Sequence, residues 1–412
     1  MPCGGGAGQR VRGRRLTQGF ARGIDRVHGV RVGGFRESRQ PLSLPPSTDS
    51  LAIVARKLAE TLVFAAIGGL TLGLLGMPAG FLSGSILMVA VASLAGRPML
   101  IPLLPMRILL VLIGISLGAV VTPATLHGMA AYPLSIAVLL AAMICISVSG
   151  AAYLRMVHGW DKITAYLAAA PGGLSQVMGL AAELDADIRA IAIVQTVRVA
   201  IIAIGLPAGL SLFGLVSRGA RSVGGPFNPA QLDELAILIA ASTVAALIAY
   251  RIRFPGGLLF GAMLTSAALH GSGTIHVVMP WWVTNMVMMA FGAVTGSRFA
   301  GTPLRMLAHF IGAAFGSFAV AVAVTAVFAA GLVGILGLPI GEVMIAYAPG
   351  AVDAMMLLAL ALNLDPVYVG AHHLVRIFFV SLAMPLLAHR AAPARKAVDV
   401  PVPPRKRPPF ED

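Results

Sequence analysis

Charged residues are scarce in this 412-residue chain. Asp, Glu, Lys and Arg make up only 11% of the sequence, whereas 58% is hydrophobic and the mean hydropathy is +0.89. A soluble globular domain is about one quarter charged, so the composition argues against an ordinary soluble fold. Apolar stretches of about 20 residues recur, the length that a helix needs to cross the ~30 Å core of a bilayer. The sequence therefore predicts an all-α, polytopic membrane protein.

Cysteine is scarce as well. Cys3 lies in the N-terminal tail and Cys145 in an apolar segment, which excludes a disulfide framework and a cysteine-based metal site. Phosphate-binding loops, nucleophile elbows and zinc-type histidine spacings are also missing from the sequence. We therefore expect no enzyme activity, no cofactor and no metal.

The net charge of +14 is concentrated at the two ends of the chain. Residues 1–57 and 390–412 hold 17 of the 30 Lys and Arg residues. Basic flanks beside membrane helices mark the cytoplasmic side and attract anionic lipid, so we expect no nucleic-acid partner. The N-terminal tail is rich in Gly and Arg without apolar periodicity. We predict disordered tails at 1–50 and 391–412.

The part between the tails is duplicated. The segment that starts with "APGGLSQVMG" and ends at Pro207 matches the segment that starts with "APGAVDAMML" and ends at Pro385, at an offset of 178 residues. Upstream, "MPAGFLSG" matches "FPGGLLFG". The sequence therefore predicts two membrane repeats, at 51–225 and 226–390.

Each repeat contains four apolar segments, an interrupted segment and a sixth apolar segment. In the first repeat they lie at about 58–76, 78–96, 106–123, 131–155, 162–183 and 187–214. In the second repeat they lie at about 234–250, 254–270, 282–299, 307–333, 340–363 and 366–389.

The interrupted segments break at 171–173 and 349–350, where Pro and Gly stand together. Pro removes a backbone donor and Gly permits sharp turns. Each half-segment is about ten residues long, or ~15 Å of helix, which is half of the membrane. Two structures fit this pattern: a broken helix that crosses fully, or a re-entrant hairpin that returns to its starting side.

The basic loops change place between the repeats. Lys and Arg cluster at 97–107 and 155–162 in the first repeat, but at 251–253 and 298–305 in the second. Such a reversal is typical of inverted-topology repeats, which need an odd number of crossings each. Five crossings and one re-entrant or broken helix hairpin per repeat satisfy this, with both termini in the cytoplasm.

Two arginines stand at matching positions in the last segment of each repeat. Arg198 and Arg376 lie mid-segment, where an arginine costs at least ~2.5–3.5 kcal/mol in a membrane helix. Each has a polar residue three positions earlier on the same helix face, Gln195 or His373. We expect the arginines and these two residues to bind an anionic substrate or to gate it; the alternative is a purely structural pairing with an acid of a hairpin.

The hairpin tips are further candidates for a binding site. Irregular backbone at membrane depth persists only where protein or a wet cavity surrounds it. Asp353, four residues after Pro349, and His372 are candidates for coupling to an ion. The tip residues predicted to bind substrate are Gly172, Gly173, Ser175, Gln176 and Gly350.

The duplicated motifs resemble those of the AbrB-type duplicated membrane protein family of bacteria, over about 55–390. The matching residues are "APGG" with "ADIR" and "QTVRV" in the first repeat, and "APGAVDAM" with "HHLVR" in the second. This family is distinct from the small DNA-binding regulator of the same name. The resemblance implies the labels that its members carry: regulator of gene expression, transport protein or ammonia monooxygenase. The residues support transport and argue against the monooxygenase, which needs several converging metal ligands.

We therefore predict a multi-pass secondary transporter of the bacterial inner membrane for a small organic anion, coupled to protons or sodium. Its expected partners are the substrate, the coupling ion and the lipid bilayer, and a homodimer is an open alternative to a monomer. The second reading is a membrane-embedded regulator that affects gene expression without net transport. The sequence supplies no soluble effector domain, which weighs against that reading.

Overall fold

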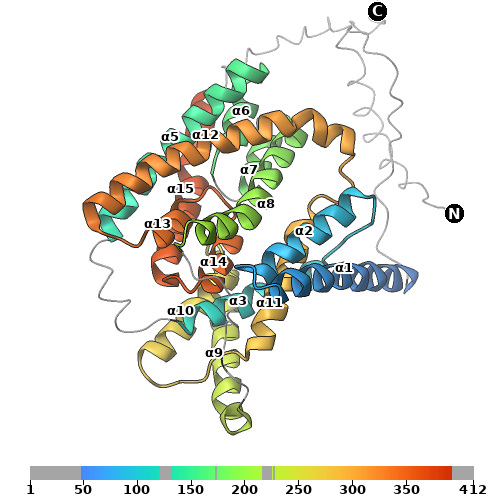
Figure 1. The fold of residues 1–412 in the computed structure, drawn as a ribbon, viewed down its shortest axis with the longest axis vertical. Coiled ribbons are helices and arrows are strands. Elements are labelled where there is room, and N and C mark those ends of the chain that lie inside the picture. Colours follow the sequence, from blue (N-terminus) through green and yellow to red (C-terminus); the bar gives the residue numbers. More distant parts are fainter. Residues whose placement is uncertain (1–47, 121–131, 172–173, 216–224, 226–227, 392–412) are drawn as a thin grey trace, which may run out of the picture. The chain divides into compact units, whose positions relative to one another are not determined.

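The computed structural model describes residues 48–120, 132–171, 174–215, 225 and 228–391. Its regular elements are helices, which confirms the predicted all-α fold (Figure 1). The predicted tails fall outside the described residues, except at their inner ends. Residues 48–50 begin the first helix, and residue 391 ends the last one.

The helix pattern repeats along the chain. The first repeat contains α1 (Thr48–Leu74), α2 (Gly80–Leu94), α3 (Leu103–Gly118), α5 (Tyr132–His158), α6 (Lys162–Ala169), α7 (Leu174–Glu183) and α8 (Ile188–Leu212). The second contains the short 3-10 helix η2 (Pro229–Gln231), α9 (Leu232–Arg251), α10 (Gly257–Gly271), α11 (Trp281–Ser297), α12 (Leu304–Leu336), α13 (Ile340–Tyr347), α14 (Val352–Ala361) and α15 (Pro366–Ala391). The helices α6, α7 and α8 begin 178 residues before α13, α14 and α15, so the duplication also appears in the structure.

Unusual backbone conformations repeat with the helices. Asp185 and its counterpart Asn363 have φ values of 54° and 55°, and both lie just after the second helix of an interrupted segment. This left-handed region is rare for residues other than Gly, and Asp and Asn tolerate it best. The same local turn is therefore built twice.

The helices pack in two groups. A scaffold group contains α1, α2, α3, α9, α10 and α11, and a hairpin group contains α5 to α8 and α12 to α15. The groups meet chiefly where α2 packs on α8 and where α3 packs on α14. Because each repeat supplies helices to both groups, the halves 51–225 and 226–390 are interleaved and are not separate compact bodies.

Within the scaffold group the two repeats exchange helices. The helix α3 packs on α10 of the other repeat, and α11 packs on α2. A Cβ atom at Gly114 of α3 would collide with the carbonyl oxygen of Leu259, and one at Gly292 of α11 would lie 2.8 Å from the carbonyl oxygen of Leu82. The absence of side chains at these glycines lets the helices approach closely.

Several helices are long and apolar enough to cross a bilayer. Among the described residues these are Tyr132–His158, Ile188–Leu212, Pro229–Arg251 and Leu304–Leu336. Shorter apolar helices accompany them, including α2, α3 and α10. These features are consistent with a polytopic membrane protein. The count of ten crossings and the inverted orientation of the repeats stay predictions.

Candidate functional site at the two interrupted helices

The first interrupted segment turns back on itself. The backbone N–H of Asp187, just before α8, donates to Thr164 Oγ1 in the first turn of α6 at 3.0 Å. Eleven residues further along α8, Arg198 reaches the carbonyl of Ala169 at the end of α6. The helices α6 and α8 therefore start at the same level and run in parallel, so the intervening α7 must run back. Of the two structures left open by the sequence, the geometry selects the returning hairpin.

The hairpin helices are short. The helix α6 has 8 residues, as does α13 in the second repeat, and a helix of this length rises only ~12 Å. Pro171 and Pro349 follow directly on the last turns of these helices and prevent them from continuing. A helix of this length spans less than half of a ~30 Å hydrocarbon core.

Arg198 is bound to the end of the first hairpin helix. Its Nη1 donates to the carbonyl of Ala169 at 3.1 Å, and its Nη2 donates to the carbonyl of Ala170 at 2.9 Å. The last carbonyls of a helix have no partner within the helix and carry the negative end of its dipole. The guanidinium supplies both the missing donors and the opposite charge.

Arg376 does the same for the second hairpin. Its Nη1 donates to the carbonyl of Ala348 at 2.7 Å, and its Nη2 donates to the carbonyl of Ala346 at 2.8 Å. The Gly350 carbonyl at the tip lies 3.5 Å from Nη1. The exposed fraction is 1% for Arg376 and 3% for Arg198. Each arginine in an apolar helix is thus compensated by backbone carbonyls of the hairpin in its own repeat.

These contacts leave one N–H donor of each guanidinium group without an acceptor. The Nε atoms of Arg198 and Arg376 are buried without a hydrogen-bond partner among the described residues. The two side chains also lie close enough for their charges to interact. No ion pair to either arginine occurs in the part of the chain that the structure describes. The site therefore holds two buried positive charges with unpaired N–H donors.

The polar residues one turn before the arginines also face the hairpin helices. Gln195 donates from Nε2 to the carbonyl of Leu167 at 2.9 Å. His373 is its counterpart and lies beside the carbonyl of Ile345, but both ring nitrogens lack a partner of normal hydrogen-bond geometry. The structure therefore brings Gln195 to the first hairpin and His373 to the second, as the shared helix face predicts.

His372 points to a different neighbour. Its Nε2 lies 2.7 Å from Ser135 Oγ on α5, and its Nδ1 lies 2.7 Å from the carbonyl of Tyr368. The hydroxyl of Tyr368 contacts the same Ser135 Oγ at 2.6 Å. The two adjacent histidines therefore belong to separate environments.

Asp353 is not among the partners of Arg376. It lies in the first turn of α14, and its carboxylate interacts electrostatically with Arg298 in the loop after α11. Burial lowers the pKa of Arg298, and the Asp353 carboxylate opposes that change. The acid of the second hairpin is thus coupled to a loop arginine instead of the mid-helix one.

The remaining tip residues are only partly visible. Gly172 and Gly173 fall outside the described residues, and Ser175 and Gln176 are described only as backbone in the first turn of α7. Gly350 lies at the tip of the second hairpin, between α13 and α14.

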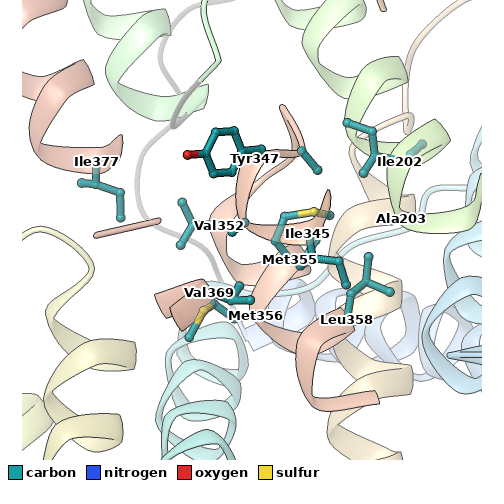
Figure 2. Packing of buried hydrophobic residues seen from close by; sticks show 14 of the residues in the cluster. Ile202, Ala203, Ile345, Tyr347, Val352, Met355, Met356, Leu358, Val369 and Ile377 are labelled. Carbon is teal, nitrogen blue, oxygen red and sulfur yellow. The ribbon is translucent and has the colours of Figure 1, made fainter. Parts of the chain in front are cut away.

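An apolar cavity of about 400 Å³ reaches the second hairpin tip. Ala348 and Pro349 line it together with side chains of α8, α12 and α13. Figure 2 shows the packing around this hairpin, where Ile202 of α8, Tyr347 of α13 and Met355 of α14 lie among buried apolar side chains. The volume falls in the range of small-molecule pockets.

Comparisons with known proteins point to one family. The family model described as "Transition state regulatory protein AbrB" matches residues 81–392, which is more than half of the chain. The chain belongs to the AbrB family. Its AbrB relatives include the "Uncharacterized protein YhjN" of Bacillus subtilis (strain 168), 26% identical over 352 residues, covering 79% of this chain and 90% of the relative. Another is the "Putative regulator AbrB" of Escherichia coli (strain K12), 25% identical over 328 residues, covering 78% and 93%.

Sequence reasoning missed one group of residues in this AbrB protein. Ser135, Tyr347 and Tyr368 surround His372, and none of them stands out in the sequence. A comparison of the repeats could have found them, because their counterparts at the 178-residue offset are the apolar Ala313, Ala169 and Ala190.

Proposed function

We propose that this AbrB-family protein is a secondary transporter of the inner membrane for a small organic anion, with its binding site at the two hairpin tips. The observation that carries the proposal is the pair of unpaired, buried Nε–H donors of Arg198 and Arg376. A buried donor without an acceptor costs about 1–3 kcal/mol, and more when the group is charged. A carboxylate bound between the arginines would remove this cost by accepting both N–H groups.

The second hairpin adds a further source of positive potential. The helix α14 starts at Val352, directly after the tip, and its first N–H groups have no partner within the helix. A helix N-terminus carries partial positive charge and favours anions. Opposed hairpins with such ends are how many secondary transporters build substrate sites. The tip therefore combines a helix N-terminus with a guanidinium.

The cavity at the tip supports an organic rather than an inorganic anion. The side chains around Ala348 and Pro349 are almost wholly apolar, and the space of about 400 Å³ accommodates a small molecule with a hydrocarbon part. The charged end of such a molecule would point toward the arginines and its apolar part toward α8 and α12. Asp353 and His372 are the candidates for binding the coupling ion.

The two helix groups offer a route for movement. Their contacts are concentrated where α2 packs on α8, which carries Arg198, and where α3 packs on α14, the second helix of the second hairpin. Transport by rocking one bundle against another requires such a boundary beside the binding site. We propose that the hairpin group moves against the scaffold group.

The test starts with purified protein and a panel of small carboxylates in a thermal-shift assay, followed by flux into liposomes. We expect Arg376→Ala to abolish flux and Arg376→Lys to restore little, because a point charge does not replace a planar fork that grips a carboxylate. Arg251→Ala, which removes an exposed arginine at the end of α9, is the matched control and should transport normally. Normal flux by folded Arg376→Ala protein would contradict the proposed site.

The second candidate function is membrane-embedded regulation. It is favoured by the name of the Escherichia coli relative, "Putative regulator AbrB". A regulator would bind its ligand without moving it. Ligand binding in the thermal-shift assay together with no flux in liposomes, under imposed ion gradients of either sign, would favour this second function.

A further inference from the structure

A chain of buried polar groups links α5, α13 and α15. The hydroxyl of Tyr368 lies 2.6 Å from Ser135 Oγ, and Ser135 Oγ lies 2.7 Å from His372 Nε2. The exposed fractions of Ser135 and His372 are 0%, and that of Tyr368 is 2%. Tyr347 also donates from its hydroxyl to the backbone carbonyl of Ser135. The four side chains form one connected, buried network.

The hydrogen bonds of this network have a defined direction. The Nδ1 of His372 faces the carbonyl of Tyr368, which can only accept, so Nδ1 carries a proton. In a neutral imidazole the other nitrogen, Nε2, then accepts from Ser135. Ser135 in turn accepts from Tyr368. The basic nitrogen at the end of the chain is therefore Nε2 of His372, and a proton that arrives through Ser135 binds there.

Two carboxylates stand at the other end of the chain. Tyr132 donates to Asp365 Oδ2 at 3.2 Å, and its ring packs edge-on against Tyr368 with centroids 5.3 Å apart. Glu342 lies close enough to Asp365 for their charges to interact. Both acids are only partly buried at the base of the hairpin. They can exchange protons with water there.

The first hairpin forms without such a chain. At the 178-residue offset, Ser135, Tyr368, His372, Tyr347 and Tyr132 correspond to Ala313, Ala190, Val194, Ala169 and Phe310. The hairpin α6–α7 nonetheless receives its hydrogen bond from the Asp187 N–H to Thr164 and is capped by Arg198. The fold of a hairpin therefore does not need the polar chain, and its presence at the second hairpin but not at the first indicates a functional role.

The surroundings of His372 limit what it can bind. Its titratable and charged neighbours are Tyr132 on α5, Tyr347 on α13, and Tyr368, His373 and Arg376 on α15. Glu342 on α13 and Asp365, just before α15, lie beside Tyr132. The other helices that pack on α15 carry Lys162 and Tyr166 on α6, Glu183 on α7 and Asp353 on α14. The oxygen atoms next to His372 already serve in hydrogen bonds to one another. The site is thus suited to a proton and not to a hydrated cation.

We propose that this chain is a proton path that carries H⁺ from Asp365 and Glu342 through Tyr368 and Ser135 to His372. The proton comes from water, binds at Nε2, and leaves by the same bonds reversed; the step between Tyr132 and Tyr368 uses rotation of the hydroxyls or one water. His372 and Arg376 lie four residues apart on one helix face. A proton on His372 places a second positive charge beside Arg376, which strengthens the hold on an anion. This coupling rests on the proposed function, whereas proton binding itself does not.

The test measures proton binding without any substrate. Wild-type protein in liposomes on a solid-supported membrane is exposed to pH jumps, and the transient displacement current is recorded. We expect His372→Gln to lose the transient. The matched control is the same change at an exposed histidine in the loop after α10, His276→Gln; it should keep the full amplitude.

Two further variants guard against misfolding of the first. Ser135→Ala and Tyr368→Phe break the chain but leave the His372 ring in place, and we expect them to slow the transient by ~100-fold or more, because a positioned proton donor contributes about that much. A wild-type transient in His372→Gln, or in both chain-breaking variants, would overturn the proton path. Loss of the transient with flux of a carboxylate intact would overturn only the coupling, and a normal transient without any flux would leave the path standing and refute transport.

Discussion

At the scale of single residues, the two mid-helix arginines act first as caps for the broken helices. Each donates to the last carbonyls of the hairpin helix in its own repeat. The sequence identified Arg198 and Arg376 as an equivalent pair, because charge in an apolar segment is a strong signal. It could not identify their partners, because backbone carbonyls are present at every residue and leave no trace in the sequence.

Asp353 provides a prediction at this scale. Its carboxylate interacts with Arg298 and has no bond to Arg376. We therefore expect Asp353→Asn and Arg298→Gln to be non-additive, with a coupling of roughly 1 kcal/mol, reduced by solvent because both side chains are partly exposed.

The measurement is the unfolding midpoint of the two single variants and the double variant in detergent. Asp353→Asn combined with Arg376→Gln is the control pair, and its effects should add. Equal coupling in both pairs, or coupling only in the control pair, would show that the acid of the second hairpin serves Arg376 after all.

At the scale of helices, the sequence predicts where a helix breaks, but it does not predict the direction in which the chain continues after the break. Pro and Gly at 171–173 and 349–350 predict a break, and the helices do end at Ala169 and Tyr347. The return depends on a tertiary contact, the hydrogen bond from Asp187 to Thr164. The residue types Asp and Thr do not predict this hydrogen bond from the sequence, because an Asp at a helix start is explained by capping alone.

Close helix packing gives the prediction at this scale. A Cβ atom at Gly114 would collide with the backbone of Leu259 on α10, which cannot move aside as a side chain could. We expect Gly114→Ala to destabilise the protein by about 1–3 kcal/mol.

The control for that experiment is Gly331→Ala in α12. A Cβ atom there meets nothing within 4 Å, so the change should be neutral or stabilising by up to ~1 kcal/mol. Thermal unfolding in detergent compares the two variants. Equal stability of both would mean that α3 and α10 are not in the close contact described here.

At the scale of the whole molecule, the sequence predicts the duplication, but it does not predict which helices of the two repeats pack on each other. The predicted repeats span 51–225 and 226–390, and the structure packs α3 on α10 and α11 on α2. Which face of a helix meets which partner depends on small residues such as Gly114 and Gly292, whose spacing fits many partners equally well. The interleaving therefore follows from packing and could not be derived from the order of segments.

The returning hairpins lead to the last prediction, which concerns orientation. A hairpin that returns does not count as a crossing, so we expect each repeat to cross the membrane five times, through α1, α2, α3, α5 and α8 or their counterparts. Five is an odd number, so this count predicts that the second repeat is inverted relative to the first. Arg97 and Thr274 occupy equivalent loops, 177 residues apart, and both are exposed. We expect these two positions to lie on opposite sides of the membrane, with Arg97 in the cytoplasm, in accord with the basic loops.

Single cysteines at the two positions, in a background without Cys3 and Cys145, can be tested with a membrane-impermeant maleimide in intact cells. Labelling at position 274 but not at position 97 is the expected result. Labelling at both positions, or at neither until the cells are opened, would place the repeats in parallel and exclude the inverted arrangement.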